Sequence, residues 1–345
     1  MTRIMIAVHH PAHVHFFKHV IRELEDGGHD VYVVVRDKEI TIELLEQCAI
    51  PHDVVVRSYE GMWDLIRTQT AYEWKLLRKG LKIRPEITLS IGSPAVGHVS
   101  KIVGATHVLF TDTDVPSNRL AIPFADVVCT PVNFERDYGS THVRYPGYHE
   151  LAYLHPDLFD PNPDVLREHG VEPEDEFFVM RFVGWGAHHD VGKKGLSREC
   201  KRRLVSRFAR EGDVYITSEG NFPEEFAEYQ LPVPSHHIHD LLYYANLYVG
   251  DSGTMATEAA LLGTPAVRSS PFPEGEDISN FAELEQKYDL LYSVVDEREV
   301  LETVDRLLDE EYTKEMWEEK RSVLLADKIN VADFVLGVVN RVKGG

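Results

Sequence analysis

The sequence predicts an α/β protein built from two Rossmann-like, doubly wound domains whose loops face one cleft. Short β-branched runs alternate with amphipathic stretches along the chain, and strands buried between helices indicate parallel sheets covered on both faces. The alternation pauses once, over residues 143–176, where Pro, Tyr and His are frequent. We therefore expect an N-terminal domain over residues 1–150, a second domain over 151–325, and a C-terminal helix over 326–345 that packs back on the first domain.

Hydrophobic periodicity places the individual elements. The clearest amphipathic pattern runs from His13 to Asp26 and stops at Gly27-Gly28, which predicts a helix with a glycine C-cap. The predicted strands are residues 4–8, 31–35, 54–56, 87–91, 107–111 and 127–130 in the first half, and 177–181, 214–217, 247–250 and 266–268 in the second. Further predicted helices are residues 198–210, 239–245 and 253–262, with more helices in the tail from 297 to 342.

The acidic composition limits the classes of partner. The 345 residues carry 57 Asp and Glu against 36 Lys and Arg, a formal charge of −21. Such a surface repels phosphate backbones, so nucleic-acid binding is disfavoured, and the excess of Arg over Lys suggests a salty cytosol. No apolar run reaches the roughly 18 residues of a membrane span. The three cysteines are scattered, which fits a reducing compartment, so we expect a cytoplasmic protein.

The segment after the predicted strand 247–250 carries the clearest binding signal. A loop of small residues, Asp251 to Thr254, opens a helix, and the free amides and dipole of a helix start favour a phosphate. Gly253 allows close approach, while Ser252 and Thr254 add hydroxyl donors. Glu258 lies one turn later on the same face, where a carboxylate can accept from the two hydroxyls of a ribose. The alternative is a capped helix in an α/β core, with Glu258 only complementing the dipole.

This Asp-Ser-Gly-x-x-x-x-Glu-Ala…Leu-Gly-x-Pro pattern resembles the nucleotide-diphosphate motif of the GT-B superfamily, which includes UDP-N-acetylglucosamine 2-epimerases and MurG-type glycosyltransferases. The resemblance implies that Ser252, Gly253 and Thr254 hold a diphosphate and that Glu258 holds the ribose. It implies a nucleotide-diphosphate sugar as substrate and no separate cofactor. Residues 12–17, 148–155, 181–190 and 238–245 are similar to an archaeal family of unknown function within that superfamily, which implies the GT-B fold.

Histidines dominate the loop after the first predicted strand, which reads His9-His10-Pro-Ala-His13-Val-His15. A histidine at a strand end that faces a cleft is a candidate base, because it titrates near neutral pH. His13, which lies in a stretch similar to the MurG-type enzymes, is our first candidate for a catalytic residue, and His15 is the second. Either could instead cap the helix or sit in the core. A shared metal ion is disfavoured if both are helical, since side chains two residues apart diverge.

Other strand ends carry further candidates. Arg181 could grip a diphosphate or form an ion pair in an acidic protein. His188 could position phosphate or sugar, and Ser218 with Glu219 could border the base or the ribose. Candidates whose roles stay open are His239, Asp240 as a helix cap, Glu150, and the strand-end stretches 92–94 and 112–114.

Three functions fit this set of residues. The first is a glycosyltransferase that uses a UDP-linked sugar and a glycan or lipid-linked acceptor, with His13 taking the acceptor proton. The second is a nucleotide-sugar 2-epimerase, although residues 180–182 do not reproduce the Thr-x-His-Arg stretch of epimerases. The third is a nucleotide-sugar binding protein without catalysis.

Overall fold

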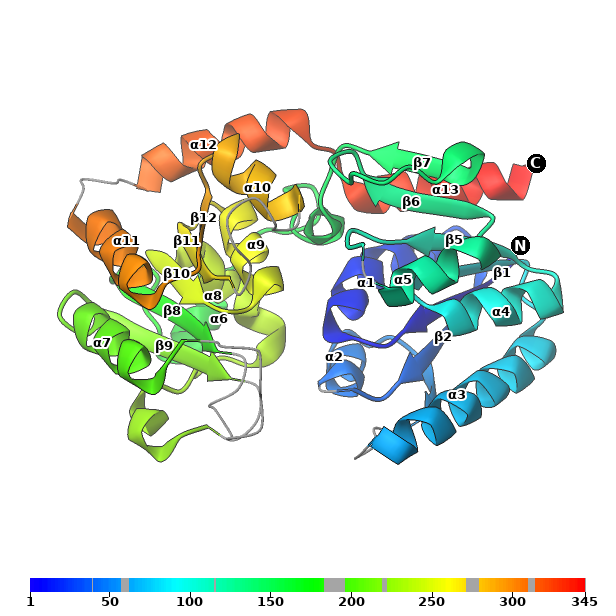
Figure 1. Ribbon diagram of the computed structural model, residues 1–345, viewed down its shortest axis with the longest axis horizontal. Helices are drawn as coiled ribbons and strands as arrows, with labels where there is room; N and C mark the ends of the chain where they lie inside the picture. Colours follow the sequence, from blue (N-terminus) through cyan, green and yellow to red (C-terminus); the bar gives the residue numbers. More distant parts are fainter. Residues whose placement is uncertain are drawn as a thin grey trace. The chain divides into compact units, whose positions relative to one another are not determined.

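The computed structural model contains two compact units, which are described separately (Figure 1). Unit 1 comprises residues 1–158 and 328–345, and unit 2 comprises residues 159–327. The structure describes residues 1–38, 40–56, 62–114, 116–182, 196–218, 222–270, 279–309 and 314–344. Each unit holds one parallel sheet with helices on both faces, which confirms the predicted fold class.

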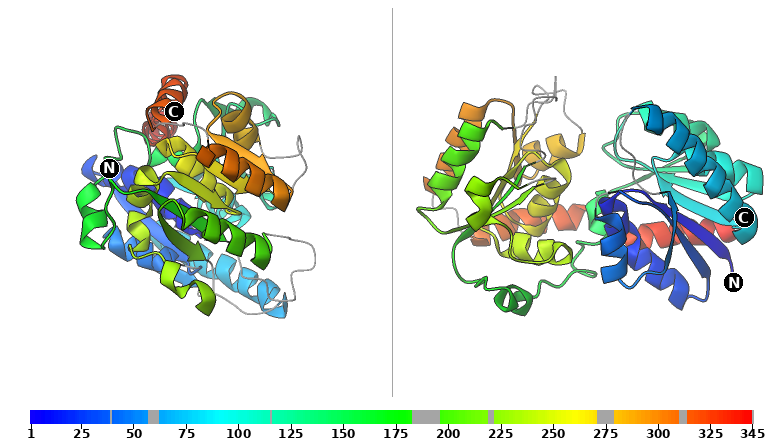
Figure 2. Two further views of the ribbon diagram at one scale, coloured as in Figure 1. Left: turned by 90° about the vertical axis from the view of Figure 1, so that its left-hand side faces the viewer. Right: turned by 90° about the horizontal axis from the view of Figure 1, so that it is seen from below.

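Unit 1 is built on a seven-stranded sheet in the order β3-β2-β1-β4-β5-β6-β7. Helices α1 and α13 contact one another on one face, while α3 and α4 lie on the other (Figure 2). The strands are β1 (Arg3–Val8), β2 (Asp30–Arg36), β3 (His52–Val56), β4 (Ile87–Ile91), β5 (Thr106–Phe110), β6 (Val127–Pro131) and β7 (His142–Tyr145). The helices are α1 (Pro11–Asp26), α2 (Thr41–Gln47), α3 (Met62–Ile83), α4 (Pro94–Val103), α5 (Pro116–Ala121) and α13 (Val331–Gly344).

Unit 2 is built on a five-stranded sheet in the order β12-β11-β10-β8-β9. Helices α7 and α11 cover one face, and α8 and α9 cover the other. The strands are β8 (Phe177–Phe182), β9 (Asp213–Ser218), β10 (Leu247–Gly250), β11 (Ala266–Ser269) and β12 (Leu291–Val294). The helices are α6 (Pro163–Glu168), α7 (Arg198–Phe208), α8 (Ile238–Tyr244), α9 (Gly253–Leu262), α10 (Ser279–Gln286), α11 (Glu297–Asp309) and α12 (Lys314–Asp327).

Strand order gives each sheet one switch point, where consecutive connections leave in opposite directions. In unit 1 the switch point lies between β1 and β4, and in unit 2 it lies between β8 and β10. Ligands of open parallel sheets bind outside the carboxyl ends of the strands at such a point, because the two loops diverge there. The fold therefore directs attention to the loops after β1 and β4, and after β8 and β10.

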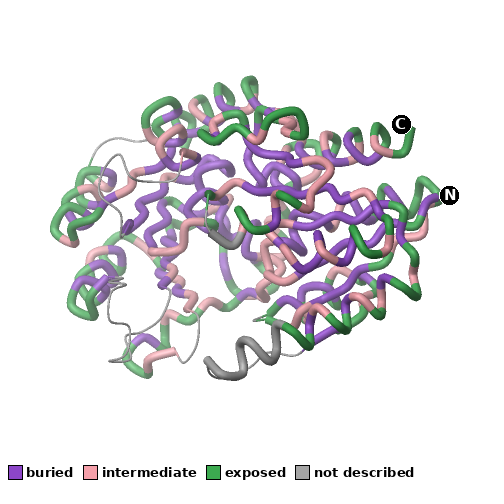
Figure 3. The backbone as a smooth tube through the Cα atoms, turned by 45° about the vertical axis from the view of Figure 1, so that its right-hand side comes forward, coloured by how far each residue is buried: buried purple, intermediate pink, exposed green. Residues whose placement is uncertain are grey.

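The buried strands hold the cores of both units (Figure 3). Along β1, every residue from Ile4 to Val8 is fully buried, as a central parallel strand requires. The predicted strands all appear in the sheets. Two strands were not predicted, β7 and β12, because both are only four residues long and neither shows a clear apolar pattern.

Helix α1 begins two residues earlier than its hydrophobic pattern indicates. His10 is the N-cap, its Nδ1 accepts from the amide of Ala12 at 3.2 Å, and Pro11 occupies the first turn. Proline fits that position because its missing N–H has no intrahelical acceptor there. His13 and His15 are therefore both helical. Across the described residues, no helix combines the length and the apolar character needed to cross a bilayer.

Candidate functional site

The start of α9 lies at the switch point of unit 2 and is open to a ligand. Ser252 is the N-cap, and its Oγ accepts from the amide of Met255 at 3.5 Å. Ser252 and Gly253 are half-buried and Thr254 is exposed. The first amides of a helix have no intrahelical acceptor, and the dipole adds positive potential there. This turn can therefore receive an anion, while the Ser252 hydroxyl keeps its own proton for donation.

Close backbone contact joins this turn to the end of β8. Gly250 pairs in register with Arg181, and the amide of Asp251 donates to the Arg181 carbonyl oxygen at 3.2 Å. A Cβ at Gly250 would lie 2.4 Å from that oxygen, so only glycine fits. The structure thus brings Arg181 next to the Ser252 turn, as the diphosphate hypothesis requires.

The Arg181 side chain and Ser218 lie on neighbouring strand ends. Nη1 of Arg181 donates to Oγ1 of Thr217 at 3.1 Å, which orients the guanidinium along the carboxyl edge of the sheet. Ser218 ends β9 and pairs in register with Phe182. The two candidate residues therefore flank the same edge. His188 and Glu219, the other two predicted contacts, lie outside the described residues.

Glu258 is buried in the second turn of α9 and is engaged by a histidine. Its Oε1 lies 3.0 Å from Nε2 of His239 in α8, and the two side chains are only 7% and 3% exposed. A carboxylate removed from water requires such a donor or a charge partner. This pairing was not predicted from the sequence, although His239 itself was named as a candidate.

Asp240, the neighbour of His239, does not cap α8 as expected. The helix N-cap is His237, and no side chain makes a capping hydrogen bond there. Asp240 instead accepts from the amide of Asn162 at 2.9 Å and pairs with His237 at 3.2 Å. Asp240 is the third residue of the helix, within its first turn, and its carboxylate binds the amide of Asn162 rather than capping the helix.

Sequence reasoning missed Arg268, a second arginine at this edge of the sheet. Arg268 is 5% exposed, pairs in register with Gly250, and donates from Nη1 to Oγ of Ser293 at 3.1 Å. Its guanidinium lies 3.7 Å from the ring centroid of Phe281. The signal was present, because Arg268 ends a predicted strand of the same sheet.

Phe281 also gives Gly253 a packing role. A Cβ at Gly253 would lie 2.8 Å from Cζ of Phe281, closer than carbon atoms pack. The ring of Phe281 thus packs against both Gly253 and Arg268. Close packing accounts for a glycine at this position on its own, so Gly253 is weaker support for a phosphate than the open turn itself.

A buried lysine adds positive charge beside the turn. Lys201 in α7 is 3% exposed, and its Nζ lies 4.7 Å from the ring centroid of Phe182. Burial lowers the pKa of Lys201, and the negative charge of Asp251 partly offsets that effect. Nothing in the sequence distinguished Lys201 from the other basic residues of its helix.

In unit 1, three histidines gather after β1 at the switch point. The rings of His9 and His13 meet edge to face with centroids 4.3 Å apart, and those of His10 and His13 are 5.9 Å apart. His13 is buried. His15 faces a different neighbour, with its ring centroid 5.2 Å from that of Tyr153. The structure therefore brings His13 together with His9 and His10, but separates it from His15.

Burial keeps His9 and His13 uncharged near neutral pH. Burial, together with the charges of His10, Arg36 and Lys38, lowers the pKa of His9 to about 4. Burial also lowers the pKa of His13 well below its ordinary value, and any positive charge on His9, His10 or His149 acts in the same direction. Neutral imidazoles exchange hydrogen bonds with hydroxyl groups rather than attract anions.

Several buried polar atoms of the cluster lack partners. Within the described residues, Nδ1 of His9, Nδ1 of His13 and Nε2 of His149 have no hydrogen-bond partner. Such an atom costs about 1–3 kcal/mol unless water or a ligand satisfies it. The loop after β1 is therefore suited to a neutral, hydroxyl-bearing ligand.

Asp112 and His149 extend the cluster from the strand-end stretch 112–114 and from η3 (His149–Ala152). Nδ1 of His149 lies 3.5 Å from Oδ2 of Asp112. Burial lowers the pKa of His149, while the carboxylate of Asp112 acts in the opposite direction. Asp114, by contrast, pairs with two arginines: its Oδ1 lies 2.8 Å from Nε of Arg119, and its Oδ2 lies 3.0 Å from Nη2 of Arg136. Asp112 is therefore the acid of this stretch that pairs with a histidine of the cluster.

A shared metal ion does not fit the pair that the sequence suggested. His13 and His15 are two residues apart in α1 and contact different rings, so they cannot converge on one ion. Among the side chains that the structure describes, no group of three His, Cys, Asp or Glu has the arrangement of a metal site.

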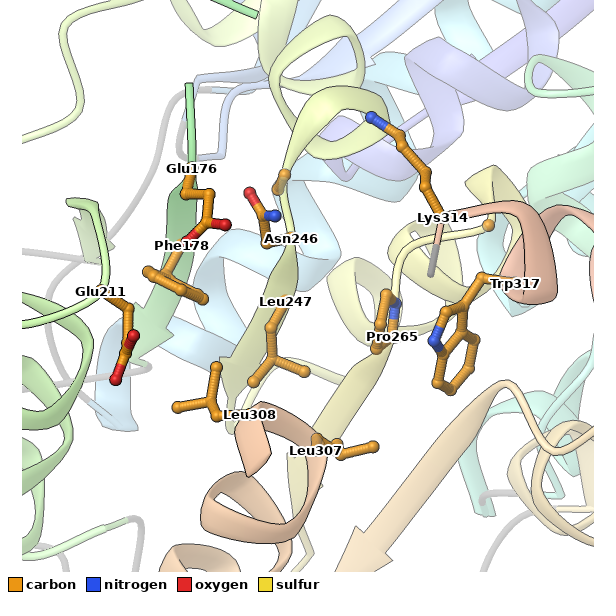
Figure 4. A pocket seen from close by; sticks show the side chains of 12 residues that line it. Glu176, Phe178, Glu211, Asn246, Leu247, Pro265, Leu307, Leu308, Lys314 and Trp317 are labelled. Atoms are coloured by element: carbon orange, nitrogen blue, oxygen red, sulfur yellow. The ribbon is translucent and has the colours of Figure 1, made fainter. Parts of the chain in front are cut away.

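A pocket of about 240 Å³ lies at the opposite edge of the unit 2 sheet (Figure 4). Its lining residues include Glu176, Asn246 and Pro265, which precede β8, β10 and β11, together with Lys314 and Trp317. It therefore opens at the amino ends of the strands, away from the Ser252 turn. Parallel sheets bind ligands at the carboxyl ends, so this pocket is not the candidate site.

Comparison with known proteins defines the family. The model of a family described as "Protein of unknown function (DUF354)" matches residues 2–333, so the chain belongs to that family. A relative, "Uncharacterized protein MJ0665" of Methanocaldococcus jannaschii, is 22% identical over 278 residues, which are 75% of this chain and 79% of that protein.

Solved structures similar to this chain include two kinds of enzyme. One is a UDP-GlcNAc 2-epimerase from Neisseria meningitidis bound to UDP-GlcNAc, with a TM-score of 0.68 and 11% identity, covering 98% of this chain and 100% of that chain. Another is the spinosyn forosaminyltransferase SpnP, with a TM-score of 0.64 and 14% identity, covering 99% of both chains. The chain has the GT-B-like fold of these epimerases and glycosyltransferases.

Proposed function

We propose that this member of the family is a glycosyltransferase that binds a UDP-linked sugar in unit 2 and a neutral hydroxyl-bearing acceptor in unit 1. One observation carries the proposal. At the switch point of the unit 2 sheet, the open start of α9 lies next to Arg181, and the buried Glu258 follows in the second turn of the same helix.

The donor contacts follow from the chemistry of these groups. The amides of Gly253 and Thr254 and the hydroxyl of Ser252 bind the diphosphate, because a helix start favours anions. Arg181 supplies a charged donor to the same diphosphate. Glu258 accepts from the ribose hydroxyls, and Ser218 borders the ribose or the base. Arg268 and Lys201, both buried nearby, raise the local positive potential within an acidic chain.

Transfer moves one proton and one sugar. The acceptor oxygen forms a bond to the anomeric carbon, the bond from that carbon to the diphosphate breaks, and UDP leaves with the bonding electrons. His13 takes the proton of the acceptor hydroxyl, since a neutral imidazole nitrogen can accept one. Arg181 and the α9 start stabilise the negative charge that develops on the leaving diphosphate.

The histidine cluster favours transfer over binding alone. Buried imidazole nitrogens without partners are costly to a protein that only stores a nucleotide, and they are suited to an acceptor hydroxyl. The structural neighbours support a UDP-sugar substrate, since one is an epimerase bound to UDP-GlcNAc and another is a glycosyltransferase.

Product analysis with UDP-sugars tests the proposal. The protein is incubated with UDP-sugars, alone and with a glycan and lipid extract, while free UDP and the sugar configuration at C2 are followed. Release of UDP only with the extract supports transfer. Inversion at C2 or release of free sugar without an acceptor supports a 2-epimerase and contradicts transfer. Saturable UDP binding without turnover supports a binding protein and also contradicts it.

A further inference from the structure

The buried pair of Glu258 and His239 has a consequence for which nucleotides this site accepts. Resting on the proposed function, we propose that His239 is a positioning residue that orients the Glu258 carboxylate toward the ribose, so that the site selects ribonucleoside over 2′-deoxyribonucleoside diphosphates. The geometry that supports this is the 3.0 Å contact between Nε2 of His239 and Oε1 of Glu258.

The contact leaves Glu258 able to bind a ribose. A carboxylate has two oxygens and about four acceptor positions, and a single imidazole N–H occupies one of them. An ionised carboxylate only accepts hydrogen bonds, so Nε2 donates to it and His239 fixes the carboxylate plane. In the proposed complex, the 2′- and 3′-hydroxyls of the ribose donate to this oriented carboxylate.

Helix α8 is itself held firmly, so His239 is a rigid support. At its start, Asp240 accepts from the amide of Asn162 at 2.9 Å. At its end, the Leu242 carbonyl accepts from Oγ1 of Thr264, which follows α9, at 2.5 Å. The ring of Phe159 meets that of His239 edge to face at 6.2 Å. These contacts join α8 to the segment at Asn162 and to Thr264 after α9, so the fold sets the position of Nε2 of His239.

The exposed start of α9 and its buried second turn are assigned to different parts of the nucleotide, the diphosphate and the ribose. Thr254 is exposed at the helix start, whereas Glu258, four residues later on the same face, is 5% exposed. Anion binding at the start depends on backbone amides, which no substitution at His239 removes. Recognition of the sugar hydroxyls depends on the Glu258 carboxylate. The two contributions can therefore be separated by experiment.

The test compares UDP with 2′-deoxy-UDP by calorimetry on the full chain and on two variants. His239→Leu keeps the volume and removes the donor, whereas His239→Gln retains an N–H in a similar place. The parent should bind UDP at least about tenfold more tightly than 2′-deoxy-UDP, since a hydrogen bond to a charged group contributes about 1.5–3 kcal/mol. His239→Leu should reduce that ratio toward one, and His239→Gln should restore it.

Matched controls separate a loss of positioning from a loss of folding. Thermal unfolding of each variant reports whether the chain still folds. Ser252→Ala should weaken both nucleotides by the same factor and leave the ratio unchanged. If His239→Leu folds and keeps the full ratio, the positioning role is wrong while the nucleotide site stands. If the parent binds neither nucleotide, the proposed function and this inference both fail.

Discussion

Replacing Gly253 with alanine separates the two explanations for a glycine at the start of α9. A Cβ at this position would lie 2.8 Å from Cζ and 3.5 Å from Cε1 of Phe281. Overpacking of this kind costs about 1–3 kcal/mol, whereas alanine improves helix propensity over glycine by up to about 1 kcal/mol. We therefore expect Gly253→Ala to lower the free energy of unfolding by about 1 kcal/mol.

A double-mutant cycle isolates the contact with Phe281. Phe281→Leu removes the ring atoms that approach Gly253, so Gly253→Ala in that background should be neutral or stabilising. Phe281→Leu also removes the contact of Arg268 with the ring, whether residue 253 is glycine or alanine, so that loss cancels in the cycle. Denaturant unfolding measures the four free energies. An equal effect of Gly253→Ala with and without Phe281 would refute the packing argument.

The same cycle bears on the phosphate site. Alanine keeps the backbone N–H of residue 253, which is the group assigned to the diphosphate. In the Phe281→Leu background, Gly253→Ala should therefore change the UDP dissociation constant by less than about threefold, or roughly 0.6 kcal/mol. A loss of UDP binding in that background, with the fold intact, would mean that the glycine is required for close approach of the ligand.

Three further predictions concern other parts of the chain. Gly250→Ala should lower the free energy of unfolding by about 3 kcal/mol, because the new Cβ would lie 2.4 Å from a backbone oxygen that cannot move aside; denaturant unfolding checks this, and a loss below about 1 kcal/mol contradicts it. Burial lowers the pKa of His107 to about 4 from 6.5, so folding disfavours its protonation, and the stability that it contributes is complete above pH 6.5 and falls with pH toward 4. This residue alone should lower the free energy of unfolding by about 2 kcal/mol between about pH 7 and pH 5. Denaturant unfolding at the two pH values should show a smaller loss for His107→Gln, and an unchanged loss would contradict the reasoning. Asp112→Asn should lower the pKa of His149 further, since the Asp112 charge now raises it; imidazole proton resonances followed against pH measure the change, and an increase would contradict the pairing.

The sheets were predictable from the sequence because their central strands are fully buried. Runs such as residues 4–8 and 247–250 are continuous apolar segments, and the loops that follow them carry the candidate residues. Short edge strands escaped prediction, since β7 reads His-Val-Arg-Tyr and is only half-buried along most of its length. The hydrophobic pattern that predicts a strand is weak where few of its side chains reach the core.

The candidate site was predictable only where it depends on local sequence. Ser252 as a helix cap follows from the residues around it, and the structure has that cap. The pairing of Glu258 with His239 joins residues 19 positions apart, and the contact of Arg268 with Phe281 depends on how α10 packs. Such contacts arise from tertiary packing, which no periodicity in one chain specifies.

The histidine cluster shows the same limit. The sequence identified His13 and His15 as the leading pair, but the start of α1 at Pro11 directs them to different neighbours. Their separation follows from helix geometry, since side chains two residues apart in a helix point in different directions. His9, whose ring meets that of His13 instead, comes from the loop after β1, and His149, which acts on His13 electrostatically, comes from η3.

A crystal structure of the full chain with UDP tests the central claim most directly. We predict that the diphosphate lies within hydrogen-bonding distance of the amides of Gly253 and Thr254, with the ribose hydroxyls on the carboxylate of Glu258. UDP bound elsewhere, for example in the pocket beside Trp317, with the Ser252 turn free of ligand, would contradict the account.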